Sequence, residues 1–246
     1  LQADMRRGGM LYVGATGAGY AQSPLLLTDP PPADLSTPDG FRLAFEEDFS
    51  GGLDNWELAQ GDWRCEGGAV LTEAKGEIVC RRKFRGDVLL VYEAGATGDT
   101  PCDLSETLNA MLDNGPMYGY FFGFGTDGNR CSRLLRRTGP IAEYDARIIS
   151  DKTHQIACMR AGRRLTHFVD GTPVFTFEDR RPISAGRQPH LSLYTHAGGW
   201  FGPVRVYERL PEPLHPLPRA VTSIRVHNRM LPAGELHSLA QQNEEP

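Results

Sequence analysis

Short runs of alternating apolar and polar residues, separated by turn-forming residues, extend from Phe41 to about residue 210. FRLAFEEDFS, which begins at Phe41, and DVLLVYEAGA, which begins at Asp87, have the length and apolar content of β-strands. Roughly a dozen such runs follow one another at spacings of about 8–15 residues, and no long window has a helical period. The pattern predicts an all-β fold, namely an antiparallel two-sheet β-sandwich of the jelly-roll type.

The clearest local signal is a hairpin in HQIACMRAGRRLTHFVDGTPVFTFED, which begins at His154. Two runs rich in Val, Phe and Thr flank Asp170-Gly171, and this dipeptide tolerates the positive φ angles of a tight turn. Arg160-Ala161-Gly162-Arg163 indicates an earlier turn in the same meander. We therefore expect three consecutive antiparallel strands here.

The distribution of these runs also predicts the domain organisation of the 246-residue chain. Residues 1–40 are rich in glycine and proline and are expected to form an irregular N-terminal arm. Residues 41–210 are expected to form the β-sandwich domain. Residues 211–246 begin with a proline-rich break and are expected to form a C-terminal arm with one possible strand, VTSIRVHNRML.

The central stretch from Cys102 to Arg137 carries the most unusual pattern. Within MYGYFFGFG, which begins at Met117, Tyr118, Tyr120, Phe122 and Phe124 point to one side and the alternate positions are mostly glycine. Such a strand offers a flat aromatic surface for a ligand, or, for Phe122 and Phe124, simply contributes to the core. Turn signals at Asn114-Gly115-Pro116 and Thr126-Asp127-Gly128-Asn129 delimit it.

Composition narrows the functional classes. The formal net charge is −5 with a pI near 5.8, so no basic field indicates nucleic acid as a partner. No apolar run is long enough for a membrane span. The five cysteines lack CxxC spacing and the histidines lack metal-ligand spacing, so no metal site or cofactor is expected. A structural calcium bound by loop oxygens near Asp99 or Asp127 is compatible with the sequence but not required.

Several segments resemble the concanavalin A-like lectin/glucanase superfamily. They are FEEDFSGGLDNWELAQGDWRCEGGAVL, THFVDGTPVFTFED and LSLYTHAGGWFGPVRVYE. DLSETLNAML, YGYFFGFG and SRLLRR further resemble a bacterial sandwich family encoded in polysaccharide-utilisation loci, often beside rhamnogalacturonan-degrading enzymes. The resemblance implies a carbohydrate partner and a secreted or periplasmic location.

Two enzymatic chemistries and one binding role fit this resemblance. A glycoside hydrolase needs two carboxylates, and Asp103 and Glu106 are candidates because a short turn could bring them together. The Glu-x-Asp-x-x-Glu strand of the superfamily's glucanases is absent. A polysaccharide lyase needs an arginine for the substrate carboxylate and a Tyr or His for proton transfer. The alternative is a non-catalytic lectin-like module in which Tyr118, Tyr120 and Trp200 stack on sugar rings.

The predicted site lies on the concave sheet and acts on an acidic polysaccharide or oligosaccharide. It consists of Asn109, Tyr118, Tyr120, Arg136, Tyr194 and His196. Arg136 is chosen to hold a substrate carboxylate, and Tyr120 or His196 to transfer a proton. Arg133 must point to the opposite face from Arg136, since the two are three residues apart on one strand. The competing interpretation makes Arg136 a structural ion-pair partner.

Overall fold

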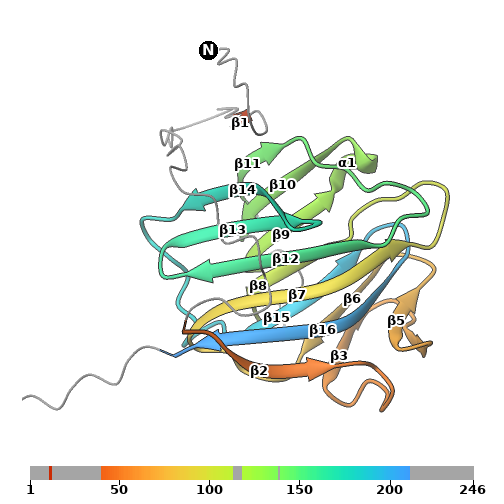
Figure 1. Ribbon diagram of the computed structural model, residues 1–246, viewed down its shortest axis with the longest axis horizontal. Helices are drawn as coiled ribbons and strands as arrows, with labels where there is room; N and C mark the ends of the chain where they lie inside the picture. Colours follow the sequence, from red (N-terminus) through yellow and green to blue (C-terminus); the bar gives the residue numbers. More distant parts are fainter. Residues whose placement is uncertain (1–10, 13–39, 113–117, 138, 211–246) are drawn as a thin grey trace, which may run out of the picture. The chain divides into compact units, whose positions relative to one another are not determined.

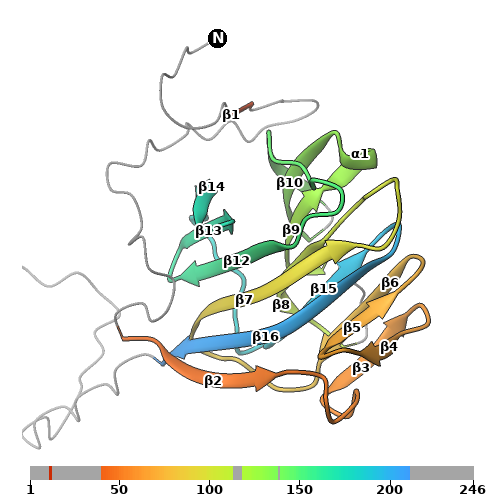
Figure 2. The ribbon, with the colours of Figure 1, turned by 45° about the vertical axis from the view of Figure 1, so that its right-hand side comes forward.

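The computed structural model describes residues 11–12, 40–112, 118–137 and 139–210. These residues form two antiparallel sheets that pack face to face, with β7 and β16 in front of β8 and β15 in the view of Figure 1. The 45° rotation in Figure 2 shows the same two layers from the side. The predicted antiparallel β-sandwich is confirmed.

The first sheet, here called the β15 sheet, contains eight strands within the described residues. Their spatial order is β1 (Leu11–Tyr12), β11 (Gly139–Tyr144), β10 (Cys131–Arg136), β9 (Tyr120–Gly125), β8 (Ser105–Ala110), β15 (His190–Thr195), β6 (Gly76–Cys80) and β3 (Trp56–Gln60). Every pairing is antiparallel.

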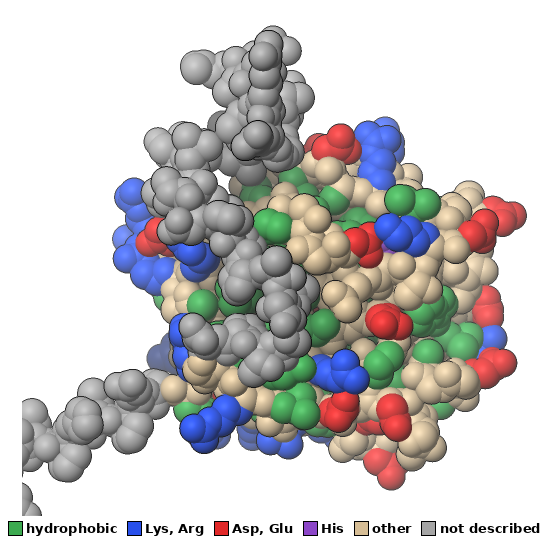
Figure 3. Space-filling view, in the orientation of Figure 1, with side chains coloured by type: hydrophobic (Ala, Val, Ile, Leu, Met, Phe, Trp, Pro, Cys, Tyr) green, Lys and Arg blue, Asp and Glu red, His purple; other side chains and the backbone are tan. Residues whose placement is uncertain are grey.

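The second sheet, here called the β7 sheet, packs against it, and on the side seen in Figure 3 acidic and basic side chains are scattered over the surface. Its order is β14 (Thr172–Glu178), β13 (Arg164–Val169), β12 (His154–Ala161), β7 (Asp87–Ala96), β16 (Gly199–Arg209), β5 (Ala69–Thr72) and β4 (Arg64–Glu66), while β2 (Arg42–Glu47) pairs with the far half of β16. Apart from β1, all strands of both sheets lie between Arg42 and Arg209.

Turn chemistry explains how consecutive strands connect. Asp170 and Gly171 have φ angles of 52° and 75°, and they join β13 to β14 as the hairpin signal predicted. Gly162, with φ 59°, joins β12 to β13. The short element α1 (Thr126–Asn129) has left-handed φ and ψ at Asp127 and Gly128, so it is a tight turn between β9 and β10, as expected. The predicted break at Asn114-Gly115-Pro116 lies outside the described residues.

The core between the sheets corrects the predicted aromatic surface. Tyr120, Phe122 and Phe124 all have 0% exposure and point inward, toward residues such as Tyr92 of the β7 sheet. The predicted alternation in β9 is confirmed, and so is the core interpretation for Phe122 and Phe124, whereas Tyr120 is not a surface residue. Burying each large ring stabilises the fold by about 1.5–3 kcal/mol. Only Tyr118, which precedes the strand and is 44% exposed, remains at the surface.

The predicted arms fall almost entirely on residues outside the described ranges. Of residues 1–40, the structure describes Gly40 and the two residues of β1, which pair with β11. The possible strand VTSIRVHNRML lies outside the described residues, as does all of 211–246.

Candidate functional site

The outer face of the β15 sheet brings together a row of polar side chains. In the strand register Tyr194 of β15 stands opposite Glu77 of β6 on one side and Ser105 of β8 on the other. Their sequence neighbours Ile78 and Leu193 belong to the core. Side chains alternate along a strand, so Glu77, Tyr194 and Ser105 project from the opposite, outer face. This row is here called the reactive row.

Glu77 is the most unusual group of the row. The residue is 1% exposed, and its Oε1 atom has no hydrogen-bond partner among the described residues. Burial raises the pKa of Glu77 to about 7, against the opposing influence of Ser192 and of the Lys75 ammonium. The Ser192 hydroxyl lies near enough to lower this pKa, but it forms no hydrogen bond of ordinary geometry with a described group. A carboxyl group with this pKa can donate a proton near neutral pH.

Asp103 supplies a second carboxylate immediately before β8. Its left-handed backbone, with φ 61°, is held by the bond from its N–H to the Gly125 carbonyl, 3.1 Å away. The Ser105 hydroxyl donates to Asp103 Oδ1 over 3.1 Å and thereby keeps the carboxylate beside the reactive row. Burial raises the pKa of Asp103, whereas Cys102, Ser105, His196 and Arg133 oppose this rise.

The Tyr194 and His196 side chains are in contact. Their spacing of two residues predicted that they share one face of the strand. The Tyr194 hydroxyl lies 3.2 Å from His196 Nδ1. The Tyr194 ring packs edge-on against Phe121, and the Lys75 ammonium lies 6.0 Å above it. Burial and the nearby Asp103 raise the pKa of Tyr194 further above its ordinary value, so this phenol stays protonated at neutral pH.

Tyr120 and Arg136, by contrast, do not reach this face. The Tyr120 hydroxyl donates to Asp179 Oδ2 over 2.6 Å and accepts from the Ile183 N–H over 2.8 Å. Arg136 Nε donates to the same Asp179 oxygen over 2.9 Å. Burial raises the pKa of Tyr120 to about 12. Both side chains fasten the segment after β14 to the core-facing side of β9 and β10, so neither can serve as the proton-transfer group or the carboxylate anchor of an outer-face site.

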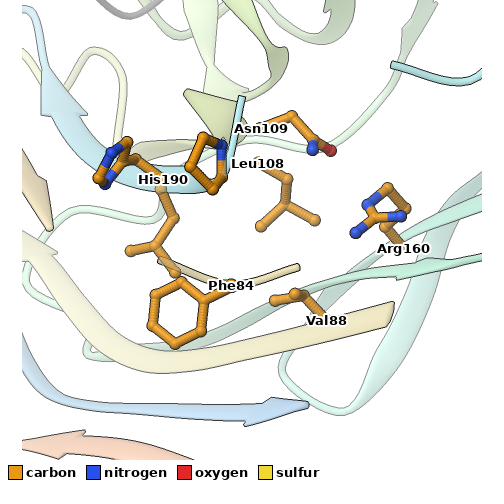
Figure 4. Close-up of a pocket in the computed structure, with 8 residues that line it drawn as sticks. Phe84, Val88, Leu108, Asn109, Arg160 and His190 are labelled. Atoms are coloured by element: carbon orange, nitrogen blue, oxygen red, sulfur yellow. The ribbon is translucent and has the colours of Figure 1, made fainter. Parts of the chain in front are cut away.

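Asn109 and Tyr118 form a third group around Gln188. Asn109 Nδ2 donates to the Gln188 carbonyl over 2.9 Å, and Gln188 Nε2 donates to the Tyr118 carbonyl over 2.6 Å. Asn109 is 5% exposed and faces a small internal cavity that also contains Arg160 (Figure 4). Its amide positions a loop, and it is not presented to a ligand on the outer face.

The predicted carboxylate pair is wrong in one of its members. Glu106 has 0% exposure and points into the core, where the Tyr92 hydroxyl donates to its Oε2 over 2.5 Å. Asp103 lies outside the core beside the reactive row, so the two residues are on opposite sides of the sheet. The partner that the structure supplies for Asp103 across Tyr194 is Glu77.

The sequence contained weak signals for the residues that were missed. Glu77 is the single carboxylate in the strand GEIVC, whose other residues are apolar or glycine. Arg133 stands on the face opposite to Arg136, as the alternation required, and it pairs with Glu143 over 3.0 Å and with Asp127 over 3.5 Å. Which arginine faced outward could only be decided once the core side of β10 was known.

Metal-binding features are limited in the part of the chain that is described. No group of three or more His, Cys, Asp or Glu side chains is arranged to hold a metal ion there. Asp127, one of the two positions considered for calcium, is engaged by Arg130 and Arg133. No helix among the described residues has the length and apolar character needed to cross a membrane.

Comparisons with known proteins identify the fold. No protein-family model matches the chain, and no curated protein sequence matches it significantly. Among solved structures, a Bacillus subtilis protein of unknown function with a galectin-like fold is similar with a TM-score of 0.54 and 8% identity, covering 69% of this chain and 99% of that one.

Two glucanases are similar to the same extent. A lichenase, a β-1,3-1,4-glucanase from a mouse hindgut metagenome, has a TM-score of 0.51 and 16% identity over 68% of this chain and 99% of its own. The β-glucanase of Bacillus licheniformis has a TM-score of 0.50 and 12% identity over 70% and 99%. The described residues thus form a concanavalin A-like jelly roll, the fold of lectins and glucanases.

Proposed function

We propose that this protein is a carbohydrate-active enzyme that hydrolyses an acidic polysaccharide or oligosaccharide on the outer face of the β15 sheet. The observation that carries the proposal is Glu77, a buried carboxyl group with an unpartnered oxygen and a pKa of about 7, in one row with Tyr194 and Ser105, the latter bonded to Asp103. The glucanases that share this fold are glycoside hydrolases by their names, which supports the same class of substrate.

In this proposal Glu77 protonates the leaving oxygen of the glycosidic bond. Glu77 and Ser105 stand on strands separated by β15, so their backbones are about 9.6 Å apart at two strand spacings. Ser105 holds the Asp103 carboxylate at the far side of Tyr194. Carboxyl groups about 6.5–9.5 Å apart leave room for a water molecule, which Asp103 would activate as general base in an inverting mechanism.

The acidic character of the substrate is supported by the cations around the two carboxyl groups. Lys75 lies over the Tyr194 ring, and Arg133 lies near enough to Asp103 to influence its pKa. A guanidinium or ammonium group at the rim suits a uronic-acid carboxylate. We include in the proposal a secreted or periplasmic site of action and a relationship to the polysaccharide-utilisation family.

The lyase alternative is less well supported by the ionisation of the tyrosines. A lyase base must remove a proton next to the substrate carboxylate, which favours a phenol with a lowered pKa. The pKa values of Tyr120 and Tyr194 are instead raised, chiefly by burial. His196 remains the candidate base for this alternative, because its Nδ1 contacts the Tyr194 hydroxyl.

The binding-module alternative loses its predicted aromatic platform. Tyr118 is exposed beside the β15 sheet, Tyr120 is in the core, and Trp200 pairs with Gly95 in the β7 sheet. The three rings therefore cannot stack on one sugar chain.

Incubation with a panel of uronic-acid polysaccharides tests the proposal. We expect new reducing ends without the ultraviolet absorbance of an unsaturated product. Absorbance that grows with the reducing ends would instead identify a lyase. Binding without either signal would identify a lectin-like module and overturn the enzymatic proposal.

A further inference from the structure

A second pocket at the other end of the β15 sheet concentrates positive charge. Lys83 and Arg85 from the loop after β6 and Arg187 from the loop before β15 line a cavity of about 250 Å³, together with His190, Met111 and Leu112. We call this cavity the basic pocket. All three cationic residues are exposed. Four of the five residues from Arg81 to Arg85 are cationic, although the whole chain has a net charge of −5.

These cations are available to a ligand. Within the described part of the chain, Lys83, Arg85 and Arg187 form no ion pair, whereas the neighbouring Arg81 contacts Glu57 over 3.3 Å. Among the residues that the structure describes, no aspartate or glutamate lines the basic pocket. Three cationic side chains that line one cavity attract a carboxylate, sulfate or phosphate group.

The backbone beneath these side chains is firmly held. The Phe84 ring is 3% exposed, and its N–H donates to the Pro189 carbonyl over 2.7 Å, which joins the two loops. The N–H groups of Arg85 and Gly86 both donate to Glu208 Oε1 over 2.6 Å.

The side chains beneath the basic pocket are packed with almost no empty space. The cavity between Phe84, Asn109 and His190 has only about 10 Å³, roughly the space of one water molecule (Figure 4). The pocket is therefore presented on a rigid base, so a ligand loses little free energy to ordering of the backbone.

The position of the pocket relates it to the reactive row. His190 and Tyr194 are both on β15, four residues apart, which corresponds to about 13 Å along the strand. That distance is on the order of two to three sugar units. A volume of about 250 Å³ is smaller than a typical drug-sized pocket and suits a single sugar residue.

We propose that the basic pocket is a distal subsite that binds the carboxylate of a uronic-acid residue two or three units from the bond that is cleaved. The inference rests on the proposed function for the identity of its ligand. Lys83 and Arg187 contact the carboxylate from the two loops, and Arg85 adds charge at the rim. The subsite would explain why an acidic protein keeps a basic loop at the end of this sheet.

Isothermal titration calorimetry with trigalacturonate tests the subsite, and the methyl-esterified trisaccharide provides a neutral ligand of similar shape. The titration uses a Glu77→Gln background, so that the ligand is not consumed. We expect Lys83→Ala and Arg187→Ala each to weaken trigalacturonate binding about tenfold, as loss of one charged hydrogen bond would. Arg164→Ala removes another exposed cation, from the β7 sheet, and should change nothing. The esterified ligand should bind at least about tenfold more weakly, and added salt should weaken trigalacturonate binding.

Either of two results would overturn the subsite: no binding of trigalacturonate, or equal affinities of the Lys83→Ala, Arg187→Ala and Arg164→Ala variants. Lys83 and Arg187 are exposed and lie in different loops. If one of the two alanine variants misfolds, the other still tests the subsite. A Glu77→Gln variant that still cleaves polysaccharide would refute the proposed function alone and would leave the pocket's affinity for the anion as a separate finding.

Discussion

Arg136 is the residue whose predicted role differs most from the role that its contacts in the structure indicate. It was chosen as a carboxylate anchor, but its Nε atom donates to Asp179, whose side chain is 9% exposed. Asp179 also accepts from Tyr120 and from the backbone N–H of Arg181. A carboxylate with three donors holds the segment after β14 against the β15 sheet, which is a structural role.

Tyr120→Phe should therefore lower stability without changing carbohydrate binding. The variant keeps the ring in the core but removes one donor from Asp179 and leaves the Ile183 N–H without its partner. We expect a loss of about 1–3 kcal/mol, the usual cost of an unsatisfied buried group, measured by urea unfolding. Unchanged stability would show that this network is not structural.

At the scale of the element, the sequence predicts which residues share a face of each strand. It does not predict which of the two faces is buried in the core. In β9 the sequence places Tyr120 and Phe121 on opposite faces of the strand, and in β10 it does the same for Arg133 and Arg136. The reason is that side chains alternate between the two faces along a strand. The choice of the buried side depends on which strands pack above it, and the rings that meet Phe122 and Phe124 come from the other sheet, His167 of β13 and His154 of β12. The Asp170-Gly171 hairpin was predictable because its signal is entirely local.

Because the buried face of a strand is not predictable from local sequence, the sequence also does not predict a polar cluster that lies between the sheets. Glu106 Oε1 lies 3.3 Å from His167 Nε2, and the Tyr144 hydroxyl lies 2.5 Å from His167 Nδ1. Tyr92 of β7 and Cys158 of β12 complete the titratable groups that face Glu106. Burial raises the pKa of Glu106 to about 8 and lowers that of His167 to about 3, so the pair is neutral at pH 7.

The buried Glu106 carboxyl should make folding depend on pH. Its pKa is higher in the folded protein than the ordinary value of 4.5, so folding takes up a proton between about pH 4.5 and 8. This contribution is fully present below pH 4.5 and is lost as the pH rises through about 8. His167 acts oppositely, since its stabilising contribution is present above pH 6.5 and is lost as the pH falls toward 3.

Glu106→Gln isolates the first of these effects, because Glu77 and His167 remain in both proteins. Relative to the wild type, the variant should gain stability by on the order of a few kcal/mol between pH 5 and pH 8.5. Urea unfolding at several pH values measures the difference. Parallel pH profiles for the two proteins would show that Glu106 does not carry the extra proton.

At the scale of the whole molecule, the cysteines provide a direct check on the packing. None of the five forms a disulfide, and only Cys65 is exposed. Thiol titration should therefore detect one fast-reacting group in the native protein and five after denaturation without a reductant. Five free thiols would count against the secreted or periplasmic location included in the proposal, whereas fewer than five would demonstrate a disulfide and support that location.

At the same scale, the proposed function places catalysis on the outer face of the β15 sheet. The reactive row lies at one end of β15 and the basic pocket at the other, while the β7 sheet packs against the β15 sheet. A fold shared with glucanases and a galectin-like protein does not choose between catalysis and binding. The Glu77→Gln variant distinguishes the two, because only catalysis requires the Glu77 proton.

The most direct test compares the rate of reducing-end release by the wild type, Glu77→Gln and Glu93→Gln on a cleaved uronic-acid polysaccharide. Glu93 is an exposed carboxylate of the β7 sheet and serves as the matched control. The account predicts that Glu77→Gln lowers kcat about 10²–10⁴-fold, the usual contribution of a general acid, and that the wild-type rate falls as the pH rises through about 7. Equal rates for the Glu77→Gln and Glu93→Gln variants would contradict the account, since Glu77 would then not be the proton donor.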